Sequence, residues 1–173
     1  MKTLYLLRHA KSSWEDKACD DFDRPLNKRG RHAAKAMGDH LLACDITPAQ
    51  VLCSPSKRTR ETLERVQRRL PTALPVRFEQ GIYLAEPTTL LRRLRRLSQS
   101  LASVMIIGHN PGLEMLARTL TCGGDEQAKG RLARKFPTCA LATLTADIEG
   151  WHDLAPAGAT LDAFVVASDL AQA

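Results

Sequence analysis

The chain has 173 residues, of which 44% are hydrophobic and 25% charged, so we expect one domain, residues 1–173, with a core that needs no disulfide or metal. No apolar run reaches the roughly 18 residues of a membrane span, and the first residues lack a signal-peptide layout, which predicts a cytoplasmic protein. The net charge of +6 fits an anionic ligand but is too small to predict nucleic-acid binding.

The cysteines are five in number and have no Cys-x-x-Cys spacing, which argues against a zinc site and against a set of disulfides. Three of them, Cys44, Cys53 and Cys139, lie in apolar runs, and we expect them to pack as small hydrophobic side chains. The sequence contains no repeat, low-complexity segment or interdomain linker.

The first predicted strand ends in residues that can carry chemistry. The short apolar run at residues 4–7 is bounded by charge, which is typical of a buried strand in a parallel sheet. Arg8 and His9 follow it directly. Because ligands of open α/β sheets bind just outside the carboxyl ends of the strands, this pair is a candidate site for an anion and a reactive imidazole. The alternative is a surface histidine beside a solvated arginine.

Further along the chain, short apolar runs alternate with helical patterns. In order, we expect a polar loop at 13–24 with an exposed Trp14, a helix from an Asn27 cap to Cys44, a strand at 51–53, a helix from a Ser54 cap to Leu70, a strand at 76–78, a helix at 87–98, a strand at 104–107 and a helix from an Asn110 cap to Leu120.

The last third of the chain is less regular. Gly123 and Gly124 are predicted to end the preceding helix, residues 129–135 form a basic segment, and strands are expected at 139–146 and 163–167, with a further short strand at 151–154. Strands that alternate with helices predict a three-layer α/β/α sandwich around a largely parallel sheet. The arginines on the outer side of the helix at 87–98 indicate a solvated face; they are Arg92, Arg93, Arg95 and Arg96.

Three predicted strand ends carry related residues. Arg8 and His9 follow the first strand, Arg58 lies one turn into the helix after the second, and His109 follows the strand at 104–107. In a parallel sheet these ends share one edge. Arginine suits phosphate oxygens, an unprotonated imidazole nitrogen can attack phosphorus, and a second histidine can donate to the phosphoryl oxygens. This chemistry requires no metal and no cofactor.

The same segments resemble the histidine phosphatase superfamily, which has the phosphoglycerate mutase-like fold. Residues 7–10 are similar to its Arg-His signature, although the family usually has glycine in place of Ala10. Residues 54–62 resemble its second-arginine segment, and residues 108–110 its second histidine. Residues 8–12, followed by Arg24-Pro25-Leu26 and Gly30, are similar to the phosphohistidine phosphatase (SixA-like) branch. The resemblance is clear from residue 1 to about 121.

The resemblance implies a role for each matching residue. His9 would be the nucleophile, Arg8 and Arg58 would bind the phosphoryl group, and His109 would be the second histidine in contact with the phosphate. Three other histidines match no motif and are expected at the surface or on helices: His32, His40 and His152.

The general acid is the least defined part of the predicted site. Larger family members carry a carboxylate after the third strand, which makes Glu79 the candidate, with Glu86 less plausible and three further carboxylates in the first loop: Asp20, Asp21 and Asp23. A P–N bond needs less help from an acid, because an imidazole leaving group can take its proton from water. The chain also lacks the insertion of the larger members, which predicts an open crevice that a residue on a protein surface can enter.

These expectations favour a metal-independent phosphatase that acts on protein phosphohistidine. A phosphomonoesterase for a small metabolite and a non-catalytic module that binds a phosphorylated ligand are the alternatives, while a mutase and a nucleic-acid module fit less well. The expected partner is a phosphorylated protein of the histidine-phosphotransfer type or a small phosphate ester. No membrane or nucleic-acid partner is expected, and a monomer is favoured.

Overall fold

The structure is a computed structural model, and it describes residues 1–16 and 18–170. The strands are β1 (Lys2–Arg8), β2 (Gln50–Cys53), β3 (Val76–Phe78), β4 (Ser103–Gly108), β5 (Thr121–Gly124), β6 (Leu141–Ala146) and β7 (Ala159–Val165). The α-helices are α1 (Lys28–Ala43), α2 (Lys57–Gln67), α3 (Pro87–Arg95), α4 (Gly112–Leu120), α5 (Glu126–Arg134) and α6 (Ala167–Leu170). No helix in these two described ranges is long and apolar enough to cross a membrane.

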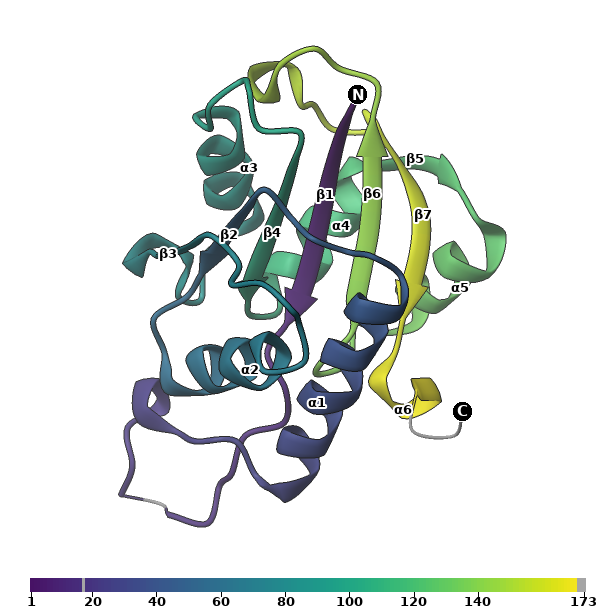
Figure 1. Cartoon of the computed structure of the whole chain (residues 1–173). Coiled ribbons are helices and arrows are strands. Elements are labelled where there is room, and N and C mark those ends of the chain that lie inside the picture. Colours follow the sequence, from purple (N-terminus) through teal and green to yellow (C-terminus); the bar gives the residue numbers. More distant parts are fainter. Residues whose placement is uncertain (17, 171–173) are drawn as a thin grey trace.

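The strands form one sheet in the order β3-β2-β4-β1-β6-β7-β5. Strand β6 runs antiparallel to β1 and β7, and the other neighbouring pairs are parallel. The prediction of a largely parallel sheet is therefore confirmed. Because β1, β2 and β4 run in the same direction, their carboxyl ends lie at one edge, where the loop between β1 and α1 also lies (Figure 1).

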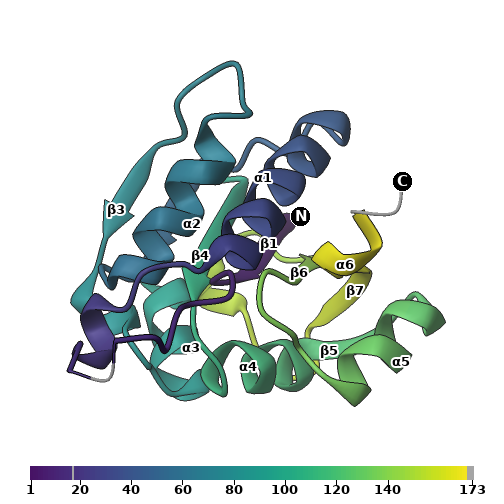
Figure 2. The same cartoon turned by 90° about the horizontal axis from the view of Figure 1, so that it is seen from below.

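Helices cover both faces of this sheet (Figure 2). Helices α1, α2 and α6 pack on one face, and α3, α4 and α5 pack on the other. The fully buried neighbours Ile106 and Ile107 point to opposite faces, as successive residues of a strand do. Each such side chain contributes roughly 1.5–3 kcal/mol through burial. The three-layer α/β/α sandwich of the phosphoglycerate mutase-like fold is thus confirmed.

Two helices begin later than predicted, because the predicted caps have other partners. Helix α2 begins after Ser56 rather than Ser54, whose hydroxyl instead lies 2.7 Å from Nε2 of His109. Helix α4 begins at Gly112, since the amide of Asn110 donates to the Glu114 carboxylate and to the Phe136 carbonyl. Both differences lie at the edge of the sheet where the polar strand ends meet.

In the last third of the chain, the prediction misses an edge strand at residues 121–124 and is wrong about a strand at residues 151–154. Residues 121–124 form an edge strand despite two glycines, because the backbone of β5 pairs with β7 and a Cβ on Gly124 would lie 2.1 Å from the Leu161 carbonyl oxygen. The basic segment belongs to α5, whose first turn is capped by Asp125, and residues 151–154 include a 3₁₀ turn instead of a strand.

The three cysteines expected in the core have two different environments. Cys53 and Cys139 are fully buried, as predicted. Cys44 is exposed, because it caps the end of α1 beyond Leu41, the last buried residue of that helix. The exposed Trp14 was predicted correctly, with 73% of its surface accessible.

Candidate active site

The two predicted site histidines are adjacent because their strands are hydrogen-bonded neighbours. Arg8 is aligned with Gly108 in the β1–β4 pair, and the next residue of each strand is a histidine. The backbone N–H of His9 continues the pairing to the Gly108 carbonyl at 3.0 Å. The ring centroids of His9 and His109 are 5.2 Å apart, which leaves both imidazoles facing one small region.

The hydrogen bond of His9 assigns its proton to one ring nitrogen. Nδ1 lies 2.8 Å from the carbonyl oxygen of Ala10, which only accepts, so Nδ1 carries the proton and Nε2 keeps its lone pair. Burial, together with the positive charges of Arg58 and Arg8, lowers the pKa of His9 to about 4 and outweighs the hydrogen bond to Ala10, which acts in the opposite direction. The His9 ring is therefore neutral near pH 7, with an unprotonated nitrogen available for attack.

Arg58 and His109 form a buried pair beside His9. Nη2 of Arg58 lies 3.2 Å from Nδ1 of His109, and since a guanidinium only donates, this nitrogen of the histidine accepts. Nε2 of His109 then carries the proton and donates to the Ser54 hydroxyl at 2.7 Å. Burial, with smaller contributions from His9 and Arg58, lowers the pKa of His109 to about 3. His109 is therefore a neutral ring that accepts from Arg58 and donates to Ser54.

The first loop reaches the site through Asp21. One carboxylate oxygen of Asp21 accepts from Nη2 of Arg58 at 2.9 Å and from the Tyr83 hydroxyl at 2.6 Å, and its backbone carbonyl accepts from Nη1 of Arg58. Burial raises the pKa of the Asp21 carboxyl, but the hydrogen bonds from Tyr83 and Arg58 outweigh it and the net shift is downward. Asp21 is therefore ionised near neutral pH and orients Arg58. Tyr83 also packs edge-on against His109, with ring centroids 5.3 Å apart.

The arginines retain donors that nothing in the described structure uses. Nη1 of Arg8 donates to the Phe136 carbonyl at 2.8 Å. However, the Nε atoms of Arg8, Arg24 and Arg58 and Nη1 of Arg24 are buried without a hydrogen-bond partner among the described residues. Buried polar groups are nearly always paired in proteins, and unpaired cationic donors are costly. Several such donors around one imidazole are suited to an anion with several oxygens.

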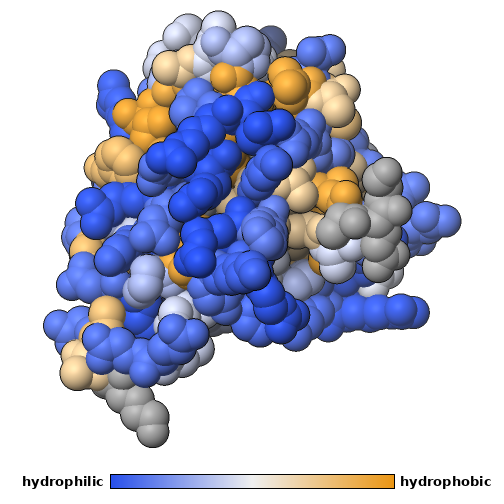
Figure 3. All heavy atoms as spheres, turned by 60° about the horizontal axis from the view of Figure 1, so that its bottom comes forward, coloured by the Kyte–Doolittle hydropathy of each residue, from blue (hydrophilic) through white to orange (hydrophobic). Residues whose placement is uncertain are grey.

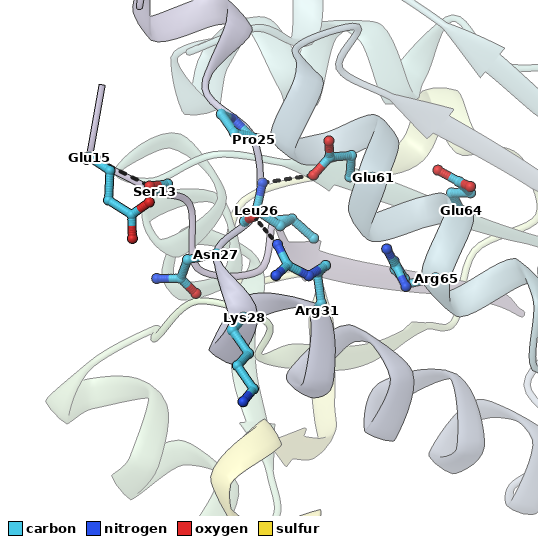
Figure 4. A pocket seen from close by; sticks show the side chains of 10 residues that line it. All are labelled: Ser13, Glu15, Pro25, Leu26, Asn27, Lys28, Arg31, Glu61, Glu64 and Arg65. Carbon is cyan, nitrogen blue, oxygen red and sulfur yellow. Dashed lines mark hydrogen bonds between the residues drawn. The ribbon is translucent and has the colours of Figure 1, made fainter. Parts of the chain in front are cut away.

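A cavity of about 350 Å³ opens beside His9, and it is lined by Arg8, His9, Lys11, Ser12, Trp14, Arg24, Lys135, Pro137 and Thr138. Its charged lining is basic. A larger cavity of about 480 Å³ between the first loop, α1 and α2 has a mixed lining that includes Glu61, Arg31 and Arg65 (Figure 4). The positive charges of the first cavity favour a phosphoryl group. The second cavity, with both acidic and basic side chains, favours neither an anionic nor a cationic ligand.

The carboxylate expected after the third strand has a different partner. Both oxygens of Glu79 accept from Arg93, at 2.7 Å from Nε and 2.6 Å from Nη2. Within the part of the chain that the structure describes, Glu79 makes no hydrogen bond to His9, Arg58 or His109. The structure therefore brings Arg8, His9, Arg58 and His109 together and leaves Glu79 in an ion pair outside this group. The second candidate, Glu86, precedes α3 at its N-cap.

Five residues of the site region were not predicted to take part: Ser12, Arg24 and Trp14 from the first loop, Ser54 after β2, and Tyr83 after β3. Ser54 was interpreted as a helix cap, and Arg24 was noted only as part of a motif. Their positions follow from the path of the loops, for which hydrophobic periodicity carries no signal. Of the unmatched histidines, His32 and His152 are exposed and His40 is half-buried. Within residues 1–16 and 18–170, no three His, Cys, Asp or Glu side chains are grouped so that they could hold a metal ion.

The sequence is similar to known proteins along nearly its whole length. Residues 4–83 match the family model of the histidine phosphatase superfamily, branch 1. The uncharacterized protein Rv1276c of Mycobacterium tuberculosis is 34% identical over 163 residues, which are 92% of this chain and 99% of that protein. An uncharacterized chloroplastic protein of Arabidopsis thaliana, At3g52155, is 30% identical over 161 residues, which are 88% of this chain and 70% of that protein.

Solved structures agree with this similarity. SixA from Agrobacterium tumefaciens superposes with a TM-score of 0.81 at 28% identity, over 95% of this chain and 97% of that one. SixA from Nakamurella multipartita gives a TM-score of 0.82 at 28% identity, over 95% of each chain. The chain belongs to the histidine phosphatase superfamily. Its structural neighbours place it in the SixA-like branch, and together these similarities support a phosphatase activity.

Proposed function

We propose that this phosphatase hydrolyses phosphohistidine on a protein, through a covalent phosphohistidine at His9 and without a metal or cofactor. The observation that carries the proposal is the geometry of His9. Its Nδ1 donates to the Ala10 carbonyl, so its Nε2 is unprotonated, and it lies among buried arginines whose donors are not all used. A neutral imidazole beside unpaired guanidinium donors suits attack on a phosphoryl group.

The reaction has two transfer steps. In the first, the lone pair of His9 Nε2 forms a bond to phosphorus while the P–N bond of the substrate breaks, and the departing imidazole nitrogen takes a proton from water. In the second, water attacks the phosphorus of phosphorylated His9 and gives a proton back to the solvent, which balances the proton taken up in the first step. The Nε2–P bond breaks, and inorganic phosphate leaves. Arg8 and Arg58 neutralise the phosphoryl oxygens in both steps, and His109 holds Arg58 in place by accepting a hydrogen bond from its Nη2.

The proposed mechanism does not need a positioned carboxylic acid. Glu79 is occupied by Arg93, and Asp21 is ionised and bound to Arg58. A protein phosphohistidine releases an imidazole, which is a much weaker base and a better leaving group than an alkoxide, so solvent can supply the proton. A phosphate monoester would require more help, which favours the P–N substrate over the ester.

The protein nature of the substrate is supported by the short connection between β3 and α3. Only residues 79–86 lie between these two elements, so no long insertion encloses the site. The two SixA neighbours are also described as candidate phosphohistidine phosphatases. A small-molecule phosphomonoesterase is the alternative within the same class, and a non-catalytic module that holds a phosphorylated protein is the alternative outside it.

The proposal is tested with a histidine-phosphotransfer domain carrying ³²P-phosphohistidine. We expect release of inorganic phosphate in the presence of EDTA, slower turnover of phosphoserine peptides and p-nitrophenyl phosphate, and an acid-labile, alkali-stable label on His9 after rapid quenching. The His9→Ala variant should neither take up label nor release phosphate. Release by His9→Ala at the parental rate would exclude the covalent mechanism. Binding of the phosphorylated domain without release would instead support the non-catalytic alternative.

A further inference from the structure

The loop after β1 contributes a second guanidinium, beside that of Arg8, to the cavity next to His9. Arg24 lies in a polar, acidic loop, yet only 6% of its surface is exposed. It lines the same cavity as Arg8 and His9. Its Nη2 donates to the Ser12 hydroxyl at 2.7 Å, whereas its Nε and Nη1 are buried without a hydrogen-bond partner in the described parts of the chain. A buried cation with two unused donors is unfavourable unless an anion uses them.

The orientation of this guanidinium is held by two neighbours. Its Cζ lies 3.4 Å from the ring centroid of Trp14, a stacked arrangement in which the indole covers one face of the cation. Its Nε lies 3.6 Å from a carboxylate oxygen of Asp21, close enough for attraction but too long for a hydrogen bond. Although 73% of the surface of Trp14 is exposed, the face of its indole ring covers the guanidinium of Arg24.

The backbone that carries Arg24 is also fixed, as the close-up of the neighbouring cavity shows (Figure 4). The N–H of Leu26 donates to Glu61 at 2.7 Å, and the Leu26 carbonyl accepts from Arg31 at 2.7 Å. The Pro25 carbonyl accepts from the Ser13 N–H at 2.8 Å. Hydrogen bonds therefore hold this segment to α1, to α2 and to the start of the first loop. Because the segment is already fixed, little conformational entropy is lost when Arg24 binds a ligand.

We propose that Arg24 binds the phosphoryl group together with Arg8 and Arg58, and that Trp14 positions Arg24. This inference rests on the proposed function of the same cavity. A phosphoryl group presents three non-bridging oxygens, and the unused Nε and Nη1 of Arg24 each keep a charge-assisted donor from which such an oxygen can accept. The charge of Arg24 also acts on His9 in the same direction as those of Arg8 and Arg58, lowering the pKa of the imidazole.

The test is isothermal titration of sodium tungstate, a tetrahedral oxyanion, into the full-length protein. Arg24→Gln should raise the dissociation constant by about tenfold or more, the effect of losing a charge-assisted hydrogen bond. Arg92→Gln makes the same change of charge at an exposed position of α3 and should leave the dissociation constant within about twofold of the parent. An Arg24→Gln protein that binds tungstate as tightly as Arg92→Gln would overturn the proposal.

Variants that keep part of the structure separate binding from a merely structural role. Arg24→Lys keeps the charge but not the fixed, planar donors of the guanidinium, so we expect an affinity between those of the parent and Arg24→Gln. Trp14→Phe should bind tungstate like the parent, because a phenyl ring can still cover the guanidinium, and Trp14→Ala should bind several-fold more weakly. Equal losses in Arg24→Lys and Arg24→Gln, accompanied by a changed near-ultraviolet circular dichroism spectrum, would show that Arg24 only supports the loop.

Failure of this inference can be told from failure of the proposed function. If His9 is labelled by the phosphorylated domain while Arg24→Gln binds tungstate normally, only the role of Arg24 is wrong. If Arg24→Gln loses tungstate binding but His9 is never labelled, the role of Arg24 in anion binding stands and the covalent mechanism is wrong. A parent protein that does not bind tungstate would overturn both.

Discussion

The two buried site histidines predict how the stability of the protein depends on pH. The pKa of His9 is about 4 in the folded protein and that of His109 about 3, whereas both titrate near 6.5 in an unfolded chain. Between about pH 4 and 6.5 the unfolded chain therefore binds more protons than the folded protein. Stability is fully present above pH 6.5 and is lost as the pH falls through this window.

The size of the effect follows from the width of the window. At about pH 5 the medium lies about 1.5 units below the unfolded pKa, and at about 1.4 kcal/mol per unit each histidine costs about 2 kcal/mol of unfolding free energy. His9→Gln removes one of the two contributions. The difference in unfolding free energy between the parent and this variant should therefore shift by about 2 kcal/mol, in favour of the variant, from pH 7.5 to pH 5.

Urea denaturation followed by circular dichroism, in buffers without phosphate, measures this difference directly. His32→Gln is the matched control, because His32 lies on α1 with an exposed side chain, and its pH profile should run parallel to that of the parent. The rings of His9 and His109 are close enough to interact, so a double variant is expected to deviate from additivity. A parent-minus-His9→Gln difference that is the same at pH 7.5 and pH 5 would refute a neutral, buried His9.

Three further substitutions probe the surroundings of the site. Asp21→Asn removes the carboxylate that orients Arg58, and kcat/KM should fall by about tenfold while Asp23→Asn has no such effect. Glu79→Gln should leave phosphohistidine hydrolysis within about twofold of the parent, and a much larger loss with an intact fold would restore Glu79 as the acid. Gly30→Ala places a Cβ 2.1 Å from a backbone oxygen of the first loop and should destabilise the protein by about 2 kcal/mol in thermal denaturation. Gly130→Ala, which meets nothing within 4 Å in a helix, should instead stabilise it by about 1 kcal/mol.

Most of the fold could be predicted from the pattern of apolar residues. The run at 104–107 is too short for a helix and apolar throughout, and it forms the buried strand β4. Strand β5 could not be predicted in this way, because its two glycines have no side chains to contribute to a pattern and its pairing with β7 depends on chain segments far apart. The exposure of Cys44 was missed for a related reason, since periodicity does not show where a helix leaves the core.

The candidate site was predictable as far as topology determines it. Parallel strands end at one edge, so the proximity of residues following β1, β2 and β4 followed once the sheet was inferred. The hydrogen bonds between Ser54 and His109 and between Tyr83 and Asp21 did not follow, because they depend on loop paths and rotamers. The burial of Arg24 was equally hidden, since a lone arginine in an acidic loop is typical of an exposed position.

One set of positive charges serves two purposes at His9. Arg8, Arg24 and Arg58 oppose protonation of the imidazole, and the same charges attract a phosphoryl group. In the proposed mechanism, a proton and a phosphorus atom compete for the single lone pair on Nε2, because Nδ1 donates to the Ala10 carbonyl. The arginines disfavour the proton, which adds positive charge, and favour the phosphoryl group, which brings negative charge. In this proposal, the selectivity of Nε2 for phosphorus arises from the residues that we propose to bind the substrate.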